Sequence, residues 1–141
     1  MSNSAIARRF FDEIWSAGHF ELVDELIAPD YIGHPTAPEQ TVHGPEGVKQ
    51  YIARLREGIP DLAVTVDDQL AGGEKVATRW TAHGTHDGDL MGLGPTGRSA
   101  TVTGITVQRI QDGRQIAEGW TSWDALGLFQ QLGAAPEGET R

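Results

Sequence analysis

The stretch TVTGITVQRIQDGRQIAEGWTSW, from Thr101 to Trp123, decides the fold class. Apolar and polar residues alternate on both sides of Asp112-Gly113, and this dipeptide favours a tight hairpin turn. The pattern therefore predicts two long antiparallel strands, 101–111 and 115–123, joined by that turn.

The same two-residue period continues upstream of this hairpin. Residues 62–66 and 76–83 alternate in the same way, and Gly72-Gly73 between them is a second hairpin signal. A glycine-rich segment, 84–100, connects the two pairs. The sequence thus predicts a four-stranded antiparallel meander.

Helical spacing dominates the first 60 residues. Ile6, Phe10 and Ile14 recur at intervals of four and predict an amphipathic helix that ends at Gly18. Further segments favour a short helix over 20–27 ended by Pro29, a loop over 33–45, a helix from Pro45 to Gly58, and a terminal helix over 125–132.

Helices that precede a run of strands indicate an α+β fold. A curved antiparallel sheet must bury its apolar face, and here only the N-terminal helices and the short C-terminal helix can cover it. We expect one domain over residues 1–133, a frayed tail over 134–141, and a conical pocket between sheet and helices. Such a pocket is the default ligand site.

Composition excludes several classes of function. The 141 residues carry a net charge of −9 and no cysteine, so disulfides and thiolate chemistry are excluded. No basic run is present, which argues against a nucleic-acid partner. No apolar run approaches the length of a membrane span, and the N-terminus lacks a signal-peptide pattern, so we expect a cytoplasmic protein with no membrane partner.

Two longer segments carry a family resemblance: VATRWTAHGTHDGDLMGLGPTGRSATVTGITVQRIQDGRQIAEGW and WDALGLFQQLG. With FFDEIWSAGHFELVDELIAPDYIGH near the start, they resemble the SnoaL-like polyketide cyclases, or ester cyclases, of the NTF2-like superfamily over roughly residues 5–133. The resemblance implies a cone-shaped α+β barrel, a homodimer or higher oligomer such as a tetramer, and natural-product or antibiotic chemistry without a cofactor.

The last predicted strand bears the first candidate site residues. Alternation places Gly119, Thr121 and Trp123 on one face and Glu118 on the other. The acid/base carboxylate of the family aligns with Thr121, and a threonine does not shuttle protons as a carboxylate does. Glu118 is the nearby acid, either with a direct catalytic role or in an ion pair with Arg109.

Histidines supply further candidates, because this side chain exchanges protons near neutral pH. His34 and His43 fall in the loop at the expected pocket mouth. The resemblance places His34 near a polar pocket position, so the catalytic candidates are His34, Thr121 and Glu118. The alternatives are loop hydrogen bonding for His34 and helix-start hydrogen bonding for His43. His86 either lines the pocket or pins the glycine-rich segment.

Neither a metal nor a nucleotide is expected. His83 and His86 lie three residues apart, but a metal site needs further ligands, and Asp87 and Asp89 nearby read as solvated loop acids. The run Gly92–Gly97 matches G-x-G-x-x-G only formally, since a strand rather than a helix follows it. We therefore expect no bound cofactor or metal.

Aromatic and hydroxyl residues complete the expected pocket. Trp15, Trp80 and Trp123 either fill the core or stack against a flat aromatic substrate. Thr106 aligns with a polar pocket position of the family, and Gly104 beside it is a candidate for a β-bulge.

The sequence therefore predicts an enzyme that cyclises a small hydrophobic, polyketide-like substrate by acid/base chemistry in an apolar pocket. Two alternatives stay open on the same scaffold. One is a cofactor-independent hydroxylation or epoxide opening, and the other is ligand binding without catalysis.

Overall fold

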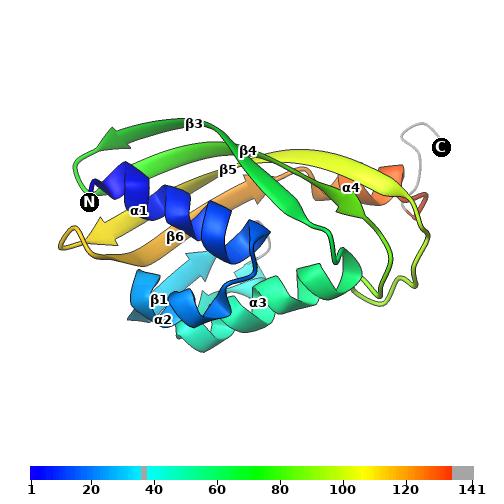
Figure 1. Cartoon of the computed structure of the whole chain (residues 1–141), viewed down its shortest axis with the longest axis horizontal. Helices are drawn as coiled ribbons and strands as arrows, with labels where there is room; N and C mark the ends of the chain where they lie inside the picture. Colours follow the sequence, from blue (N-terminus) through cyan, green and yellow to red (C-terminus); the bar gives the residue numbers. More distant parts are fainter. Residues whose placement is uncertain (36–37, 135–141) are drawn as a thin grey trace.

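A computed structural model describes residues 1–35 and 38–134 of the chain (Figure 1). The predicted tail therefore falls almost wholly outside the described residues. The elements in chain order are α1 (Asn3–Arg9), η1 (Phe10–Ser16), η2 (Phe20–Leu22), α2 (Val23–Leu26), β1 (Ile27–His34), η3 (Pro38–Gln40), β2 (Val42–His43), α3 (Gly44–Gly58), β3 (Ala63–Gly72), β4 (Lys75–Thr85), β5 (Ser99–Gln111), β6 (Gln115–Trp123) and α4 (Ala125–Gln131).

The α+β prediction is confirmed, but the expected four antiparallel strands were too few. The sheet has six strands in the order β2-β1-β6-β5-β4-β3. The predicted meander β3 to β6 is present, and its neighbours are antiparallel. β1 adds to β6 in parallel, and β2 pairs with β1, so the sheet is mixed.

β1 replaces what the sequence indicated as a helix end followed by a loop. α2 stops at Leu26, and the chain is extended from Ile27 onward. Tyr31 and Gly33 are buried while Ile32 between them is exposed, which is the alternation of a half-buried strand. Its partner β6 lies far along the chain, so no local signal announced the pairing.

Both hairpin turns lie where they were predicted. Gly73 joins β3 to β4 with φ of 59°, and Asp112 and Gly113 join β5 to β6 with φ of 56° and 62°. Positive φ at Asp112 and Gly113 is the geometry of a type I′ turn, which the Arg114 N–H closes by donating to the Gln111 carbonyl at 3.0 Å. The turns hold the meander in the register that the alternation requires.

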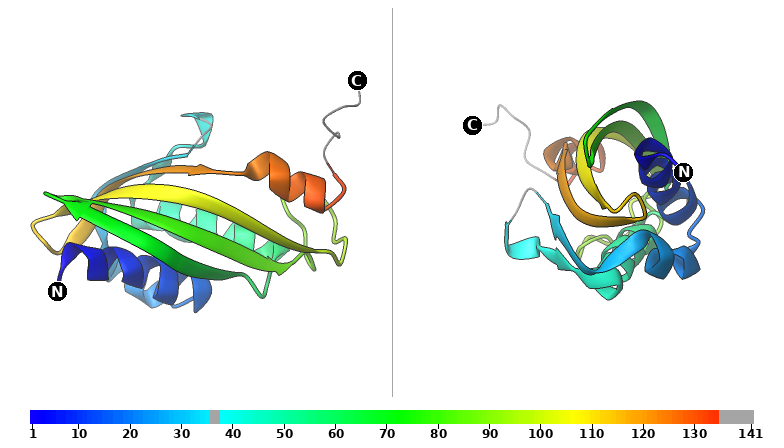
Figure 2. Two further views of the ribbon diagram at one scale, coloured as in Figure 1. Left: turned by 90° about the horizontal axis from the view of Figure 1, so that it is seen from above. Right: turned by 90° about the vertical axis from the view of Figure 1, so that its left-hand side faces the viewer.

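The helices cover one face of the curved sheet, as the end-on view in Figure 2 shows. α1 continues directly into η1, a wider π-helical segment, and together they form the predicted first helix, which ends at Gly18 with φ of 74°. α3 lies along the same side of the molecule. The sheet thus curls around a space that the helices close.

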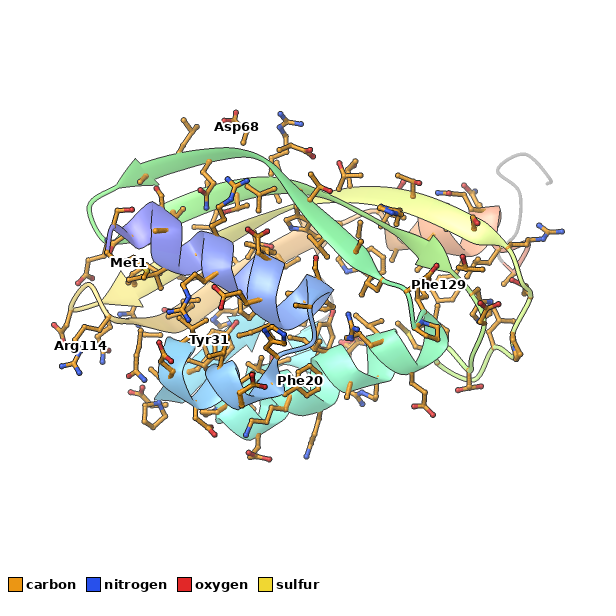
Figure 3. All side chains as sticks on the ribbon, viewed as in Figure 1. Met1, Phe20, Tyr31, Asp68, Arg114 and Phe129 are labelled. Carbon is orange, nitrogen blue, oxygen red and sulfur yellow. The ribbon has the colours of Figure 1, made fainter. Side chains whose placement is uncertain are left out.

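The core lies between sheet and helices. Its fully buried side chains include Ile14 of η1, Ile52 of α3 and Ile116 of β6. In Figure 3, Asp68 and Arg114 project outward while Tyr31, 8% exposed, lies in the interior. Within the described residues, no helix is long and apolar enough to cross a membrane.

Candidate active site

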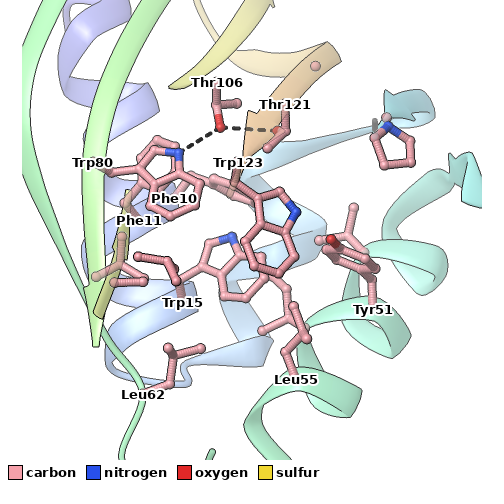
Figure 4. Close-up of a pocket in the computed structure, with 18 of the residues that line it drawn as sticks. Phe10, Phe11, Trp15, Tyr51, Leu55, Leu62, Trp80, Thr106, Thr121 and Trp123 are labelled. Carbon is pink, nitrogen blue, oxygen red and sulfur yellow. Dashed lines mark hydrogen bonds between the residues drawn. The ribbon is translucent and has the colours of Figure 1, made fainter. Parts of the chain in front are cut away.

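A pocket of about 140 Å³ opens between the concave face of the sheet and the helices. Its helical wall is apolar and includes Phe10, Phe11 and Trp15 of η1 and Leu55 of α3, as Figure 4 shows. A cavity of this size accommodates at least one aromatic ring. The expected pocket therefore exists, and its walls suit a flat apolar ligand.

The opposite wall carries a short chain of hydrogen bonds across three strands (Figure 4). The indole N–H of Trp80 on β4 donates to the hydroxyl of Thr106 on β5 at 2.9 Å. That hydroxyl lies 3.1 Å from the hydroxyl of Thr121 on β6. All three side chains line the pocket. The candidates Thr106, Thr121 and Trp80 are thus brought together on one polar strip.

Gly104 lies beside the Trp80–Thr106–Thr121 strip and leaves room for the side chains around it. The β-bulge for which it was a candidate is not present. Gly104 pairs in register with Trp80 and Trp123, and the irregularities of the sheet lie elsewhere. A Cβ atom at Gly104 would overlap the indole ring of Trp80 and would lie 2.8 Å from Cβ of Trp123. The glycine therefore lets the tryptophans beside it pack close to the strand.

Trp15 and Trp123 line the pocket, as their positions suggested. Trp15 meets Tyr51 of α3 edge to face, with ring centroids 6.0 Å apart. Burial raises the pKa of Tyr51 above its ordinary value, so its phenol stays protonated at neutral pH. These rings give the pocket a flat aromatic side.

The sequence-based prediction missed several polar pocket residues: Tyr31, Tyr51, His83 and Gln108 all line the cavity. Gln108 lies two residues after Thr106 on the same face of β5 and is 1% exposed. Tyr31 of β1 also lines the pocket, and burial raises the pKa of its phenol well above the ordinary value. Alternation from Thr106 could have indicated Gln108, whereas Tyr31 depended on the unrecognised strand β1.

His34 lies at the rim of the pocket, but its imidazole points to the outer face of the sheet. The ring stacks on Trp120 with centroids 5.5 Å apart, and Nε2 lies 2.8 Å from the carboxylate of Glu118. Trp120 and Glu118 alternate along β6 with the pocket residues Gly119 and Thr121. The pair His34–Glu118 is therefore separated from the polar strip by the strand itself.

Glu118 also contacts Arg109 at 3.5 Å, which is the ion pair that the sequence suggested. The hydrogen bond from His34 is the main cause that lowers the pKa of Glu118 below its ordinary value, and Arg109 contributes less. Among the described residues that line the pocket there is no aspartate or glutamate.

Of the other histidines weighed, His83 is among the residues that line the pocket, whereas His43 and His86 are not. His43 is exposed on β2, opposite Ile32. His86 is 1% exposed, with Nδ1 3.0 Å from the Thr96 hydroxyl and Nε2 3.2 Å from the Leu93 carbonyl. Of the two roles weighed for His86, the contacts match the pinning of the glycine-rich segment.

The run Gly92–Gly97 leads into β5 rather than into a helix, so it lacks the setting of a dinucleotide fingerprint. Over residues 1–35 and 38–134, no group of three or more histidine, aspartate or glutamate side chains is placed to hold a metal ion.

The curved sheet and the helices together define an α+β fold that encloses a mainly apolar pocket. A family model for SnoaL-like polyketide cyclases matches residues 5–132, so the chain belongs to that family. It is 30% identical to the nogalonic acid methyl ester cyclase of Streptomyces nogalater, over 84% of this chain and 89% of that protein. It is 27% identical to the aklanonic acid methyl ester cyclase AcmA of Streptomyces galilaeus, over 100% and 99% of the two chains.

Solved structures agree with this assignment. TsrD from Streptomyces laurentii superposes with a TM-score of 0.80 at 31% identity, over 93% of this chain and 94% of that one. A SnoaL-like protein from Jannaschia sp. CCS1 gives a TM-score of 0.85 at 29% identity, over 96% and 93%. The NTF2-like fold expected from the sequence is confirmed.

Proposed function

We propose that the protein closes a ring in a polyketide-type ester bound in this pocket. The observation that carries the proposal is the Trp80–Thr106–Thr121 strip, which sets hydroxyl groups into an otherwise apolar cavity. Family membership and the resemblance to two methyl ester cyclases support the same reaction class. The aromatic wall at Trp15 and Trp123 favours a flat substrate.

Ring closure by aldol addition is an isomerisation. A proton leaves the carbon beside the ester carbonyl, the resulting enolate carbon attacks a second carbonyl, and a C–C bond forms. The oxygen of that second carbonyl then takes up a proton. Atoms and charge balance without a further reactant, so protein and substrate alone suffice for the assay.

The threonine pair is suited to contact the second carbonyl oxygen, which becomes negatively charged and then takes up a proton during ring closure. A threonine hydroxyl both donates and accepts hydrogen bonds. Because the Trp80 N–H can only donate, it fixes Thr106 as its acceptor and holds the pair in place. In our proposal the pair contacts the oxygen on which negative charge develops, and a preorganised polar contact in an apolar site lowers the barrier.

We assign His34 and Glu118 a positioning role rather than a direct one. Their contact joins β1 to β6 on the outer face, behind the pocket wall. In our proposal the proton from carbon passes to water at the pocket mouth, because no aspartate or glutamate among the described residues lines the pocket.

The test incubates the purified protein with nogalonic acid methyl ester and follows the product by liquid chromatography and mass spectrometry. Ring closure gives a new peak of unchanged mass, whereas hydroxylation adds the mass of one oxygen. We expect Thr121→Val to lower kcat/KM about 10- to 100-fold, the loss expected for one buried polar contact. Thr101→Val, on an exposed position of β5, is the matched control.

His34→Ala separates the two roles of the outer pair in the same assay. A positioning role predicts a loss of turnover that parallels a loss of stability. A folded His34→Ala protein with normal stability and no turnover would instead assign the imidazole a direct role. Wild-type protein that yields no isomeric product from this and the related aklanonic ester would overturn ring closure.

Ligand binding without turnover is the second candidate. It is favoured by the position of Thr121, which stands where the family resemblance expects a carboxylate. Binding of the methyl ester, detected by quenching of pocket tryptophan fluorescence and unaccompanied by a new product, would support this role.

A further inference from the structure

Tyr31 reaches the pocket across two glycines on neighbouring strands. Gly33 of β1 and Gly119 of β6 are register partners. A Cβ atom would lie 2.9 Å from the Tyr31 hydroxyl oxygen at Gly33 and 2.8 Å from it at Gly119. A side chain at either position would displace the phenol. The two glycines therefore allow the Tyr31 hydroxyl to lie directly against the backbone of β1 and β6.

Gln108 borders the same place from the third strand. It is the register partner of Gly119, and its Cγ lies 3.8 Å from the position of a Cβ at that glycine. The Tyr31 hydroxyl and the Gln108 side chain therefore flank one spot on the pocket wall, over Gly119. Both residues line the pocket.

The Gln108 amide is left with unused hydrogen-bonding capacity. Its Oε1 is buried, and no residue described by the structure donates a hydrogen bond to it. A buried acceptor without a donor costs about 1–3 kcal/mol, so such groups are rare in native proteins. Here the unpartnered atom belongs to a side chain that lines a ligand pocket and lies beside a phenol, which can donate.

We propose that Tyr31 and Gln108 form a subsite for a substrate hydroxyl of the enol or phenol type. The substrate oxygen accepts a hydrogen bond from the Tyr31 O–H, and its own proton is donated to Oε1 of Gln108. An ether cannot make the second contact and a ketone cannot donate at all. The subsite thus selects a hydroxyl that both accepts and donates.

The choice of a polyketide-type substrate for this subsite rests on the proposed function. The distance between the subsite and the threonine pair then limits how that substrate can lie in the pocket. Gln108 and Thr106 are two residues apart on one face of β5, which separates the subsite from the threonine pair by about 7 Å. One oxygen of the substrate is held at the subsite while another meets Thr106 and Thr121. The pair of contacts sets the direction in which a flat molecule enters.

The test compares two probes of nearly equal shape, β-naphthol and β-naphthyl methyl ether, by isothermal titration calorimetry. We expect wild-type protein to bind the naphthol about tenfold more tightly, since only the naphthol donates to Gln108. Gln108→Leu should abolish this preference, and Tyr31→Phe should weaken naphthol binding about tenfold. Gln111→Leu, on the same strand but outside the pocket lining, should keep the preference.

Each outcome bears on the subsite. Equal affinity of wild-type protein for both probes, binding of neither, or a preference that survives in Gln108→Leu would overturn it. The wild-type comparison needs no variant to fold. Naphthol preference without ring closure would leave the subsite in place and remove the proposed reaction, whereas ring closure without preference would remove only the subsite.

Discussion

Single residues decide which side of β6 can take part in chemistry. Thr121 faces the pocket with Thr106, while Glu118 faces outward to His34 and Arg109. Alternation along the strand gave this division from the sequence alone. It could not orient His34, because the strand that carries His34 was not recognised, and a histidine at a strand end has no pattern that reveals its direction.

The contact between His34 and Glu118 makes the free energy of unfolding depend on pH. The pKa of Glu118 is lowered from 4.5 in the folded protein, chiefly by its hydrogen bond from His34. A lowered folded-state pKa stabilises the protein above the unfolded-state value, and this stabilisation is lost as pH falls through the folded value. Glu118→Gln should therefore reduce the free energy of unfolding at neutral pH, and the difference from wild type should shrink as pH falls below 4.5.

Urea unfolding at a series of pH values measures this difference. Glu57→Gln, at an exposed position of α3, is the control and should show no comparable change. A Glu118→Gln effect that stays constant down to about pH 3 would contradict the assignment of the carboxylate as the titrating group.

Strands show the clearest contrast between sequence and structure. β3 to β6 were predicted because each hairpin places its two strands next to each other in the chain and marks the turn with glycine. β1 was missed because its parallel partner is distant, and because Pro29 and Gly33 look locally like a helix stop and a loop. Tyr31 was lost from the predicted site for the same reason.

Close packing of β5 against its neighbours depends on Gly104. Gly104→Ala should lower the free energy of unfolding by about 1–3 kcal/mol, because the added methyl group overlaps the Trp80 ring and crowds Cβ of Trp123. Gly72→Ala is the matched control, since no atom lies within 4 Å of its Cβ position. Chemical denaturation measures both, and equal effects would show that lost chain flexibility rather than packing governs the change.

At the scale of the whole molecule, Arg56 of α3 ties three parts together. Its guanidinium donates to the carbonyls of Trp15 at 2.6 Å and Ser16 at 3.1 Å, where η1 ends, and to that of Leu62 at 3.4 Å, just before β3. One side chain thereby fixes both helical segments and the sheet edge at one end of the pocket.

Removal of the Arg56 hydrogen bonds should destabilise the folded protein. Arg56→Ala should lower the free energy of unfolding by about 1.5–3 kcal/mol, because hydrogen bonds from a charged donor are lost and their carbonyls are left without that partner. Arg54→Ala, two residues earlier and exposed, should change it by less than about 0.5 kcal/mol. Urea unfolding of both variants decides, and equal effects would contradict the role of Arg56.

The parallel contact of β1 with β6 also has a consequence for the order of folding. His34 and Glu118 are 84 positions apart, whereas each hairpin closes across a few residues. Long loops carry a larger entropic cost of closure, so the hairpins form before β1 can dock. Tyr31 arrives with β1, and the pocket is therefore among the last parts of the molecule to be completed as the chain folds.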